Sequence, residues 1–206
     1  MTIDQQRTTR TSPDLVVPDS PIWRLSVAQY HQMTQSGILT DDDPVELLAG
    51  WLVPKMPKNP PHRLATQLVR EALAQLVPTG WFVDAQEPIT TADSEPEPDV
   101  VIVRGERRHY HDRHPGPDDL ALMVEVSDTT LVRDRALKLR LYATAGVGCS
   151  WIVNLVERQV EVYTAPSGPN AASHYAQRTT YQSGALIPLA LDGAAVDELA
   201  VKALLP

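Results

Sequence analysis

The chain has 206 residues, of which 43% are apolar, and a formal net charge of −8 at pH 7. This length allows one α/β domain with its own core, and no apolar run is long enough to cross a bilayer. The acidic balance argues against a broad phosphate-binding surface, because affinity for nucleic acid comes chiefly from Lys and Arg, but it leaves room for a local basic cleft.

The N-terminal segment, residues 1–21, is polar and contains several Thr, Asp and Pro. We expect it to be a disordered tail, followed by a single domain over residues 22–206. The tail lacks the apolar stretch of a secretory signal, and the lone cysteine, Cys149, excludes an internal disulfide. We therefore expect a cytoplasmic protein with no membrane contact.

The first part of the domain predicts two helices separated by short strands. Ser26 and Gln29 resemble a capping box, and Gly37 stands where a glycine commonly follows a helix. Two short strands are expected over residues 45–53. A helix over about residues 62–76 has one apolar face, which is formed by Leu64, Leu68, Val69, Ala72, Leu73 and Leu76.

The second part predicts most of the sheet. Strand patterns follow at residues 81–83, 100–103, 121–126, 150–155, 159–163, 175–182 and 185–190. A charged loop spans residues 105–119, and helices are expected over residues 132–144 and 196–204. This order predicts an α/β fold, in which a central mixed sheet is flanked by helices.

Two of these strand patterns each carry a carboxylate in or beside an apolar run. Asp99 precedes Val100-Val101-Ile102-Val103, and Glu125 lies within Leu122-Met123-Val124-Glu125-Val126. A carboxylate in such a setting is costly unless a cation or hydrogen bonds compensate it. The pair therefore suggests a shared divalent-metal site. Taken singly, Asp99 could instead cap a turn, and Glu125 could pair with a nearby arginine.

The helix predicted over residues 132–144 can supply a cation to such a site. Asp134, Lys138 and Tyr142 are spaced by four residues, so they share one helix face. An exposed salt-bridge ladder is the common explanation of this spacing. Leu137 and Leu141 lie beside that face, however, which places Lys138 near the rim of the core. There a lysine can hold a water nucleophile or stabilise developing negative charge.

An ordered series of motifs runs from about Ser26 to Pro166. It comprises Val45-Glu46-Leu47-Leu48-Ala49-Gly50, Pro60-Pro61-His62, Glu97-Pro98-Asp99-Val100-Val101, Val124-Glu125-Val126-Ser127, Asp134-Arg135 with Lys138, Tyr142-Ala143, Ala145-Gly146-Val147 and Trp151-Ile152-Val153. In this series the chain resembles the Uma2 family, which is classed with restriction endonucleases in the PD-(D/E)XK nuclease superfamily. The series is far more specific than any one of its motifs.

The resemblance implies a restriction-endonuclease-like fold and metal-assisted hydrolysis of a phosphodiester in DNA. It implies that Asp99 and Glu125, with the backbone carbonyl of Val126, bind Mg²⁺ or Mn²⁺. Ser127 stands where the superfamily usually has its lysine, so the catalytic lysine implied by the family is Lys138. Further residues expected to line the site are Glu46, His62, Ser127, Asp134 and Tyr142. Nuclease folds of this type often pair to cut both strands, which makes a homodimer an open expectation.

Other functions remain open on the sequence alone. The acidic charge and the absence of a lysine two residues after Glu125 also fit a catalytically silent nuclease fold that serves as a binding or regulatory module. A metal-dependent hydrolase of a smaller phosphate ester is a third interpretation. His109, His111 and His114 could suggest a separate metal cluster, but they lie in a polar loop without a supporting cysteine.

Overall fold

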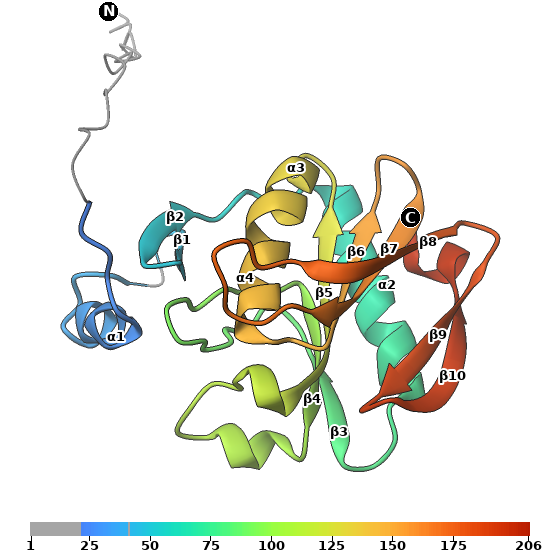
Figure 1. Ribbon diagram of the computed structural model, residues 1–206, viewed down its shortest axis with the longest axis horizontal. Coiled ribbons are helices and arrows are strands. Elements are labelled where there is room, and N and C mark those ends of the chain that lie inside the picture. Colours follow the sequence, from blue (N-terminus) through green and yellow to red (C-terminus); the bar gives the residue numbers. More distant parts are fainter. Residues whose placement is uncertain (1–21, 41) are drawn as a thin grey trace, which may run out of the picture.

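A computed structural model describes residues 22–40 and 42–206 of the chain, so the predicted tail lies outside the described residues. Its centre is a six-stranded mixed sheet (Figure 1), which confirms the predicted fold class. Only β5 and β6 pair in parallel, while the other neighbouring strands of this sheet are antiparallel. In spatial order the strands are β3 (Trp81–Asp84), β4 (Val100–Arg104), β5 (Leu120–Ser127), β6 (Cys149–Asn154), β7 (Gln159–Pro166) and β8 (Tyr175–Gln182).

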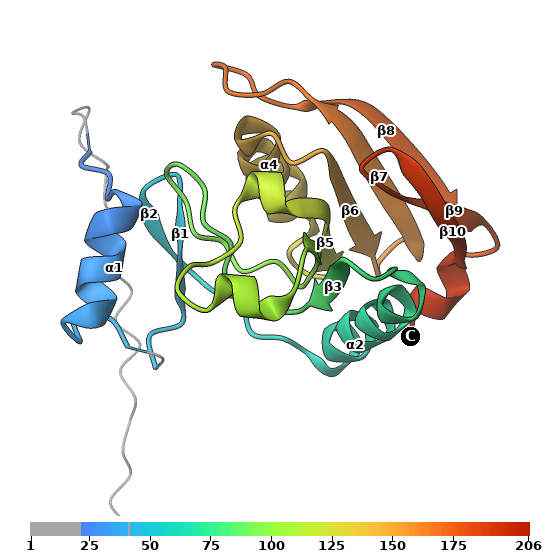
Figure 2. The same cartoon turned by 90° about the horizontal axis from the view of Figure 1, so that it is seen from below.

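Helices cover the two faces of this sheet, because its central strands are apolar on both faces. On one face, α2 (Pro60–Leu76) packs through Val69 and Leu73 against Ile102, Leu122 and Val124. The opposite face contacts the crossover between β5 and β6, which consists of α3 (Leu131–Arg133), the π-helical segment η3 (Asp134–Lys138) and α4 (Leu139–Ala145). There Tyr142 packs with Val101, Val103 and Met123. Figure 2 shows α2 and α4 on opposite sides of β5.

A smaller layer at the N-terminal side is formed by α1 (Val27–Gln35) and the hairpin of β1 (Val45–Leu48) and β2 (Trp51–Pro54). The predicted capping box is present: the Ser26 side chain accepts from the Gln29 N–H, and the Gln29 side chain accepts from the Ser26 N–H. The hairpin is tied to the segment before β4 by the Glu95 N–H, which donates to the Leu47 carbonyl at 2.7 Å. This bond holds β1 beside the segment that leads into β4.

The C-terminal segment corrects one prediction. The helix expected over residues 196–204 is instead β10 (Ala194–Ala200), which pairs with β9 (Leu186–Leu191) and is followed by the 3₁₀ turn η4 (Val201–Leu204). Asp192 and Gly193 join the strands with φ values of +51° and +78°. Two positive φ angles in an Asp-Gly loop define the tight hairpin turn that matches strand twist. The turn and cross-strand pairing outweigh the helical preference of the Ala and Leu residues here.

The charged loop between β4 and β5 contains two further short 3₁₀ turns, η1 (Arg107–Tyr110) and η2 (Pro117–Asp119). Within the described part of the chain, no helix has both the length and the apolar composition required to span a membrane.

Candidate active site

The two strand carboxylates face each other across neighbouring strands. In the register of β4 and β5, Val100 pairs with Val124, so Asp99 lies opposite Glu125 and on the same face of the sheet. Both residues are buried, with 6% and 4% of their surface exposed. Asp99 Oδ2 accepts a 2.9 Å hydrogen bond from the Val126 N–H and lies 3.1 Å from His62 Nε2. His62 reaches it from the first turn of α2.

Lys138 lies between two carboxylates from different parts of the chain. Its Nζ is 3.1 Å and 3.3 Å from the two carboxylate oxygens of Glu125, and 3.6 Å from Glu46 Oε2. The Lys138 side chain is only 5% exposed. Burial by itself would lower the pKa of this lysine, but the negative charges of Glu125 and Glu46 outweigh it and raise that pKa. The ammonium is therefore held charged inside the protein.

The acidity of Glu125 and of its neighbour Tyr142 is strongly perturbed. Burial raises the pKa of its carboxyl to about 8, against the lowering effect of Lys138. The fully buried Tyr142 hydroxyl donates a hydrogen bond to Glu125 Oε1, and burial together with the Glu125 charge raises the pKa of Tyr142. Such a perturbed carboxyl in a cavity is typical of functional sites.

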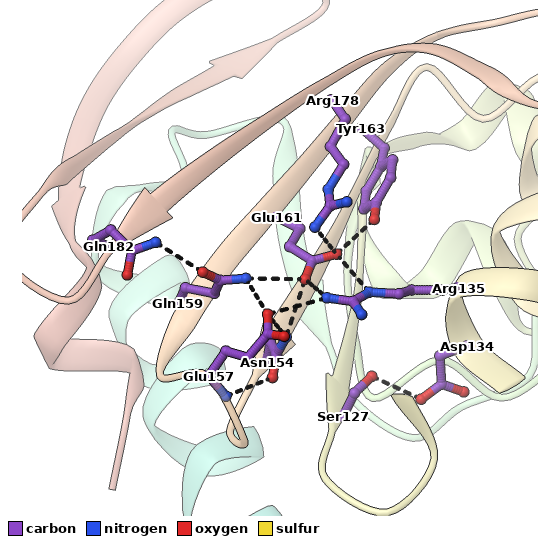
Figure 3. Close-up of polar contacts among 10 residues, drawn as sticks. All are labelled: Ser127, Asp134, Arg135, Asn154, Glu157, Gln159, Glu161, Tyr163, Arg178 and Gln182. Carbon is purple, nitrogen blue, oxygen red and sulfur yellow. Dashed lines mark hydrogen bonds and ion pairs between the residues drawn. The ribbon is translucent and has the colours of Figure 1, made fainter. Parts of the chain in front are cut away.

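Asp134 is oriented by two hydroxyl groups. Ser127 Oγ and Thr130 Oγ1 donate to its Oδ2 at 2.7 Å and 2.6 Å, and Figure 3 shows the Ser127 contact. Asp134 begins the π-helical segment, in which the Leu139 N–H donates to the Asp134 carbonyl five residues earlier. The predicted helix is thus present, but its central turn is wider than the α-helical spacing assumed. Such π turns often occur at functional sites.

A second polar cluster anchors the other side of the same turn (Figure 3). Arg135, the residue after Asp134, donates to the fully buried Glu161 of β7, with its Nε at 3.1 Å from Oε2. The carboxylate also accepts from the Tyr163 hydroxyl at 2.6 Å and pairs with Arg178 at 3.2 Å. Burial alone would raise the pKa of Glu161, but these hydrogen bonds, that of Arg135 foremost, lower it to about 2. No local sequence pattern predicted this long-range network.

Most of the predicted site residues line one cavity, which has a volume of about 60 Å³. It is lined by Asp99, Glu125, Lys138, Glu46, His62 and Asp134, and also by Val126. Ser127 and Tyr142 do not line the cavity, but they donate hydrogen bonds to Asp134 and Glu125, which do. Sequence reasoning missed a further set of charged or polar lining residues, which comprises Lys55, Lys58, Asn59, Glu97, Asp128, Thr129, Thr130 and Arg133. The loop Lys55–Asn59, which opens α2, was a recognisable source for three of them.

The donor set of this cavity fits a hard divalent cation. Among residues 22–40 and 42–206, no three or more His, Cys, Asp or Glu side chains form a preassembled metal cluster. Mg²⁺ is commonly held by one or two carboxylates, with water and substrate phosphate completing its shell. Asp99 and Glu125 carry carboxylate oxygens of this kind. A volume of this size has room for roughly four water-sized groups, which is enough for an ion and a phosphate but not for a nucleoside.

Comparisons with known proteins found one matching family and a solved structure with a similar fold. The model of the family Uma2, described as "Putative restriction endonuclease", matches residues 27–201. A crystal structure from Anabaena variabilis, described as a "putative nuclease belonging to DUF820", aligns with a TM-score of 0.64 and 15% identity, covering 87% of this chain and 97% of that one. At this identity the likeness concerns the fold. No match was found among curated proteins.

Proposed function

Because the chain belongs to the Uma2 family, we propose that it is a Mg²⁺- or Mn²⁺-dependent endonuclease that hydrolyses phosphodiester bonds in DNA. The observation that carries the proposal is the convergence of Asp99, Glu125 and Lys138, all three buried, in the lining of one cavity. Two carboxylates and an ammonium group match the needs of metal-assisted phosphodiester hydrolysis, namely metal ligands and a charge that stabilises the transition state.

In this proposal Asp99, Glu125 and the Val126 carbonyl would hold the ion. When bound, the ion polarises the scissile phosphate and lowers the pKa of the attacking water. Lys138 positions that water or offsets the charge that develops on the phosphoryl oxygens. His62, at 3.1 Å from Asp99, orients this carboxylate, and the Tyr142 hydroxyl orients Glu125. Glu46 keeps the Lys138 ammonium in place at 3.6 Å.

The charge balance of the cavity supports a metal requirement. Six carboxylates and four Lys or Arg side chains line it, an excess of two negative charges above the Glu125 pKa of about 8, where all are ionised. This charge repels a phosphate group, because like charges disfavour each other in a partly desolvated site. A divalent cation offsets the excess. A homodimer and a cytoplasmic location stay predictions.

The decisive experiment is cleavage of supercoiled plasmid DNA by the purified protein in Mg²⁺, Mn²⁺ or EDTA. We expect nicked or linear DNA only with metal, and none with the Asp99→Ala variant. Asp112→Ala is the matched control, because its carboxylate is exposed in the charged loop. Equal cleavage by Asp99→Ala and wild type would overturn the proposal.

One observation favours the rival function, a nuclease fold that serves as a binding or regulatory module. Lys138 already lies 3.1 Å from Glu125, so this carboxylate is compensated without an ion. A protein that binds DNA, takes up no Mn²⁺ in a calorimetric titration and cleaves no DNA would support this alternative. Hydrolysis of a small phosphodiester without cleavage of DNA would instead indicate a smaller substrate.

A further inference from the structure

A second hollow, here called the basic groove, lies beside α2 and has a different lining from the candidate active site. It has a volume of about 570 Å³ and includes Lys58, Arg63, Gln67 and Arg70 in its lining. No Asp or Glu lines it. This is an unusual composition for a surface of a chain with net charge −8, in which the neighbouring cavity carries an excess of carboxylates.

The three cations of this basic groove, Lys58, Arg63 and Arg70, are all exposed. Within the described residues none of them forms an ion pair, whereas Arg104, Arg107 and other arginines of the chain pair with carboxylates. Their charges therefore remain uncompensated and directed to solvent. A groove that concentrates one sign of charge attracts ligands of the opposite sign.

The groove is continuous with the candidate active site. Lys58 lines both hollows, and His62, which contacts Asp99, precedes Arg63 in α2. Arg63 and Arg70 are seven residues apart, which is two helical turns or about 10 Å along the axis. They lie on the same side of α2 but too far apart to share one phosphate. Lys58, Arg63 and Arg70 thus form a row that leads from the cavity along α2 and offers successive contacts to anions.

We propose that this groove binds the phosphate backbone of duplex DNA and leads one strand into the cavity. This inference rests on the proposed function, for which it supplies the path of the substrate. Lys58 contacts the phosphate beside the cleavage site, and Arg63 and Arg70 contact phosphates farther along. Contacts of this kind set position and general affinity, and they carry no base preference.

Binding of a fluorescent DNA duplex, followed by anisotropy over a series of salt concentrations in millimolar Ca²⁺, tests the groove apart from catalysis. The test variant is Arg63→Ala/Arg70→Ala. The matched control is Arg108→Ala/Arg140→Ala, which removes the same charge from two exposed arginines outside both hollows. Gel analysis of the recovered duplex verifies that it stays intact.

We expect the groove variant to bind more weakly. The negative slope of log affinity against log salt should become shallower by about 1.8, because each of the two lost phosphate contacts contributes about 0.9 to its magnitude. The control should keep the wild-type slope. Equal slopes for the two variants would overturn the proposal, as would wild-type protein that binds no duplex or prefers polyglutamate. Groove-dependent binding without plasmid cleavage would leave the groove in place and refute the nuclease function.

Discussion

Replacement of Lys138 by methionine tests the electrostatics at the centre of the site. Methionine keeps an unbranched apolar stem but removes the ammonium that lies 3.1 Å from Glu125 and 3.6 Å from Glu46. Both carboxylates are then left in the interior without their shared cation. Loss of one partner from a buried ion pair typically costs 3–5 kcal/mol, roughly, because the other charge stays desolvated.

The magnitude depends on pH through Glu125. Its pKa, raised to about 8 in the folded protein, exceeds the unfolded value, so protonation of Glu125 stabilises the fold at low pH and this contribution is lost as pH rises through about 8. Without Lys138 the carboxyl takes up a proton more readily. We therefore expect a loss of about 3 kcal/mol near pH 7 and about 5 kcal/mol near pH 9.

Urea denaturation measures this loss. With a slope of about 2–3 kcal/mol per molar, the midpoint should fall by roughly 1–2 M, and Lys202→Met, which removes an exposed lysine, should leave it unchanged. If Asp99 and Glu125 bind Mg²⁺, millimolar metal should stabilise Lys138→Met more than wild type, because the ion replaces the lost charge. Wild-type midpoints for Lys138→Met at both pH values would refute this reasoning.

Three further predictions follow from other features. Mn²⁺ affinity, measured by calorimetry, should rise with pH up to about 8, because the ion requires deprotonated Glu125; an affinity independent of pH would exclude Glu125 as a ligand. Glu161→Gln should lower stability by about 2–3 kcal/mol near pH 7, less than for a fully buried pair because Arg135 and Arg178 are 31% and 47% exposed. The folded pKa of Glu161 is about 2, below its pKa in the unfolded chain. Its stabilisation is therefore present above the unfolded pKa and is lost as pH falls toward the folded pKa. Variant and wild type that lose stability in parallel as pH falls would contradict this. Gly193→Ala should cost roughly 1–3 kcal/mol in thermal unfolding, because φ is +78° at this position, and an unchanged midpoint would show that the turn adapts.

The sequence by itself determined the elements that obey local rules. The Ser26 and Gln29 side chains specify the start of α1, and the apolar runs after Asp99 and around Glu125 specify two central strands. The position of each carboxylate in its strand also indicated a site, since such residues require compensation. The Asp192-Gly193 turn was equally readable, but the helical preference of residues 196–204 led to the wrong prediction there.

Tertiary structure alone decided which charges meet. Lys138 lies between Glu125 and Glu46 only because the β1–β2 hairpin is fastened beside the start of β4. The π turn is held through Asp134 on one side and Arg135, bound to Glu161 of β7, on the other. The basic groove likewise combines a loop lysine with arginines two turns apart on α2. Coulomb and hydrogen-bond energies depend on distance in space, and only the packed chain sets that distance.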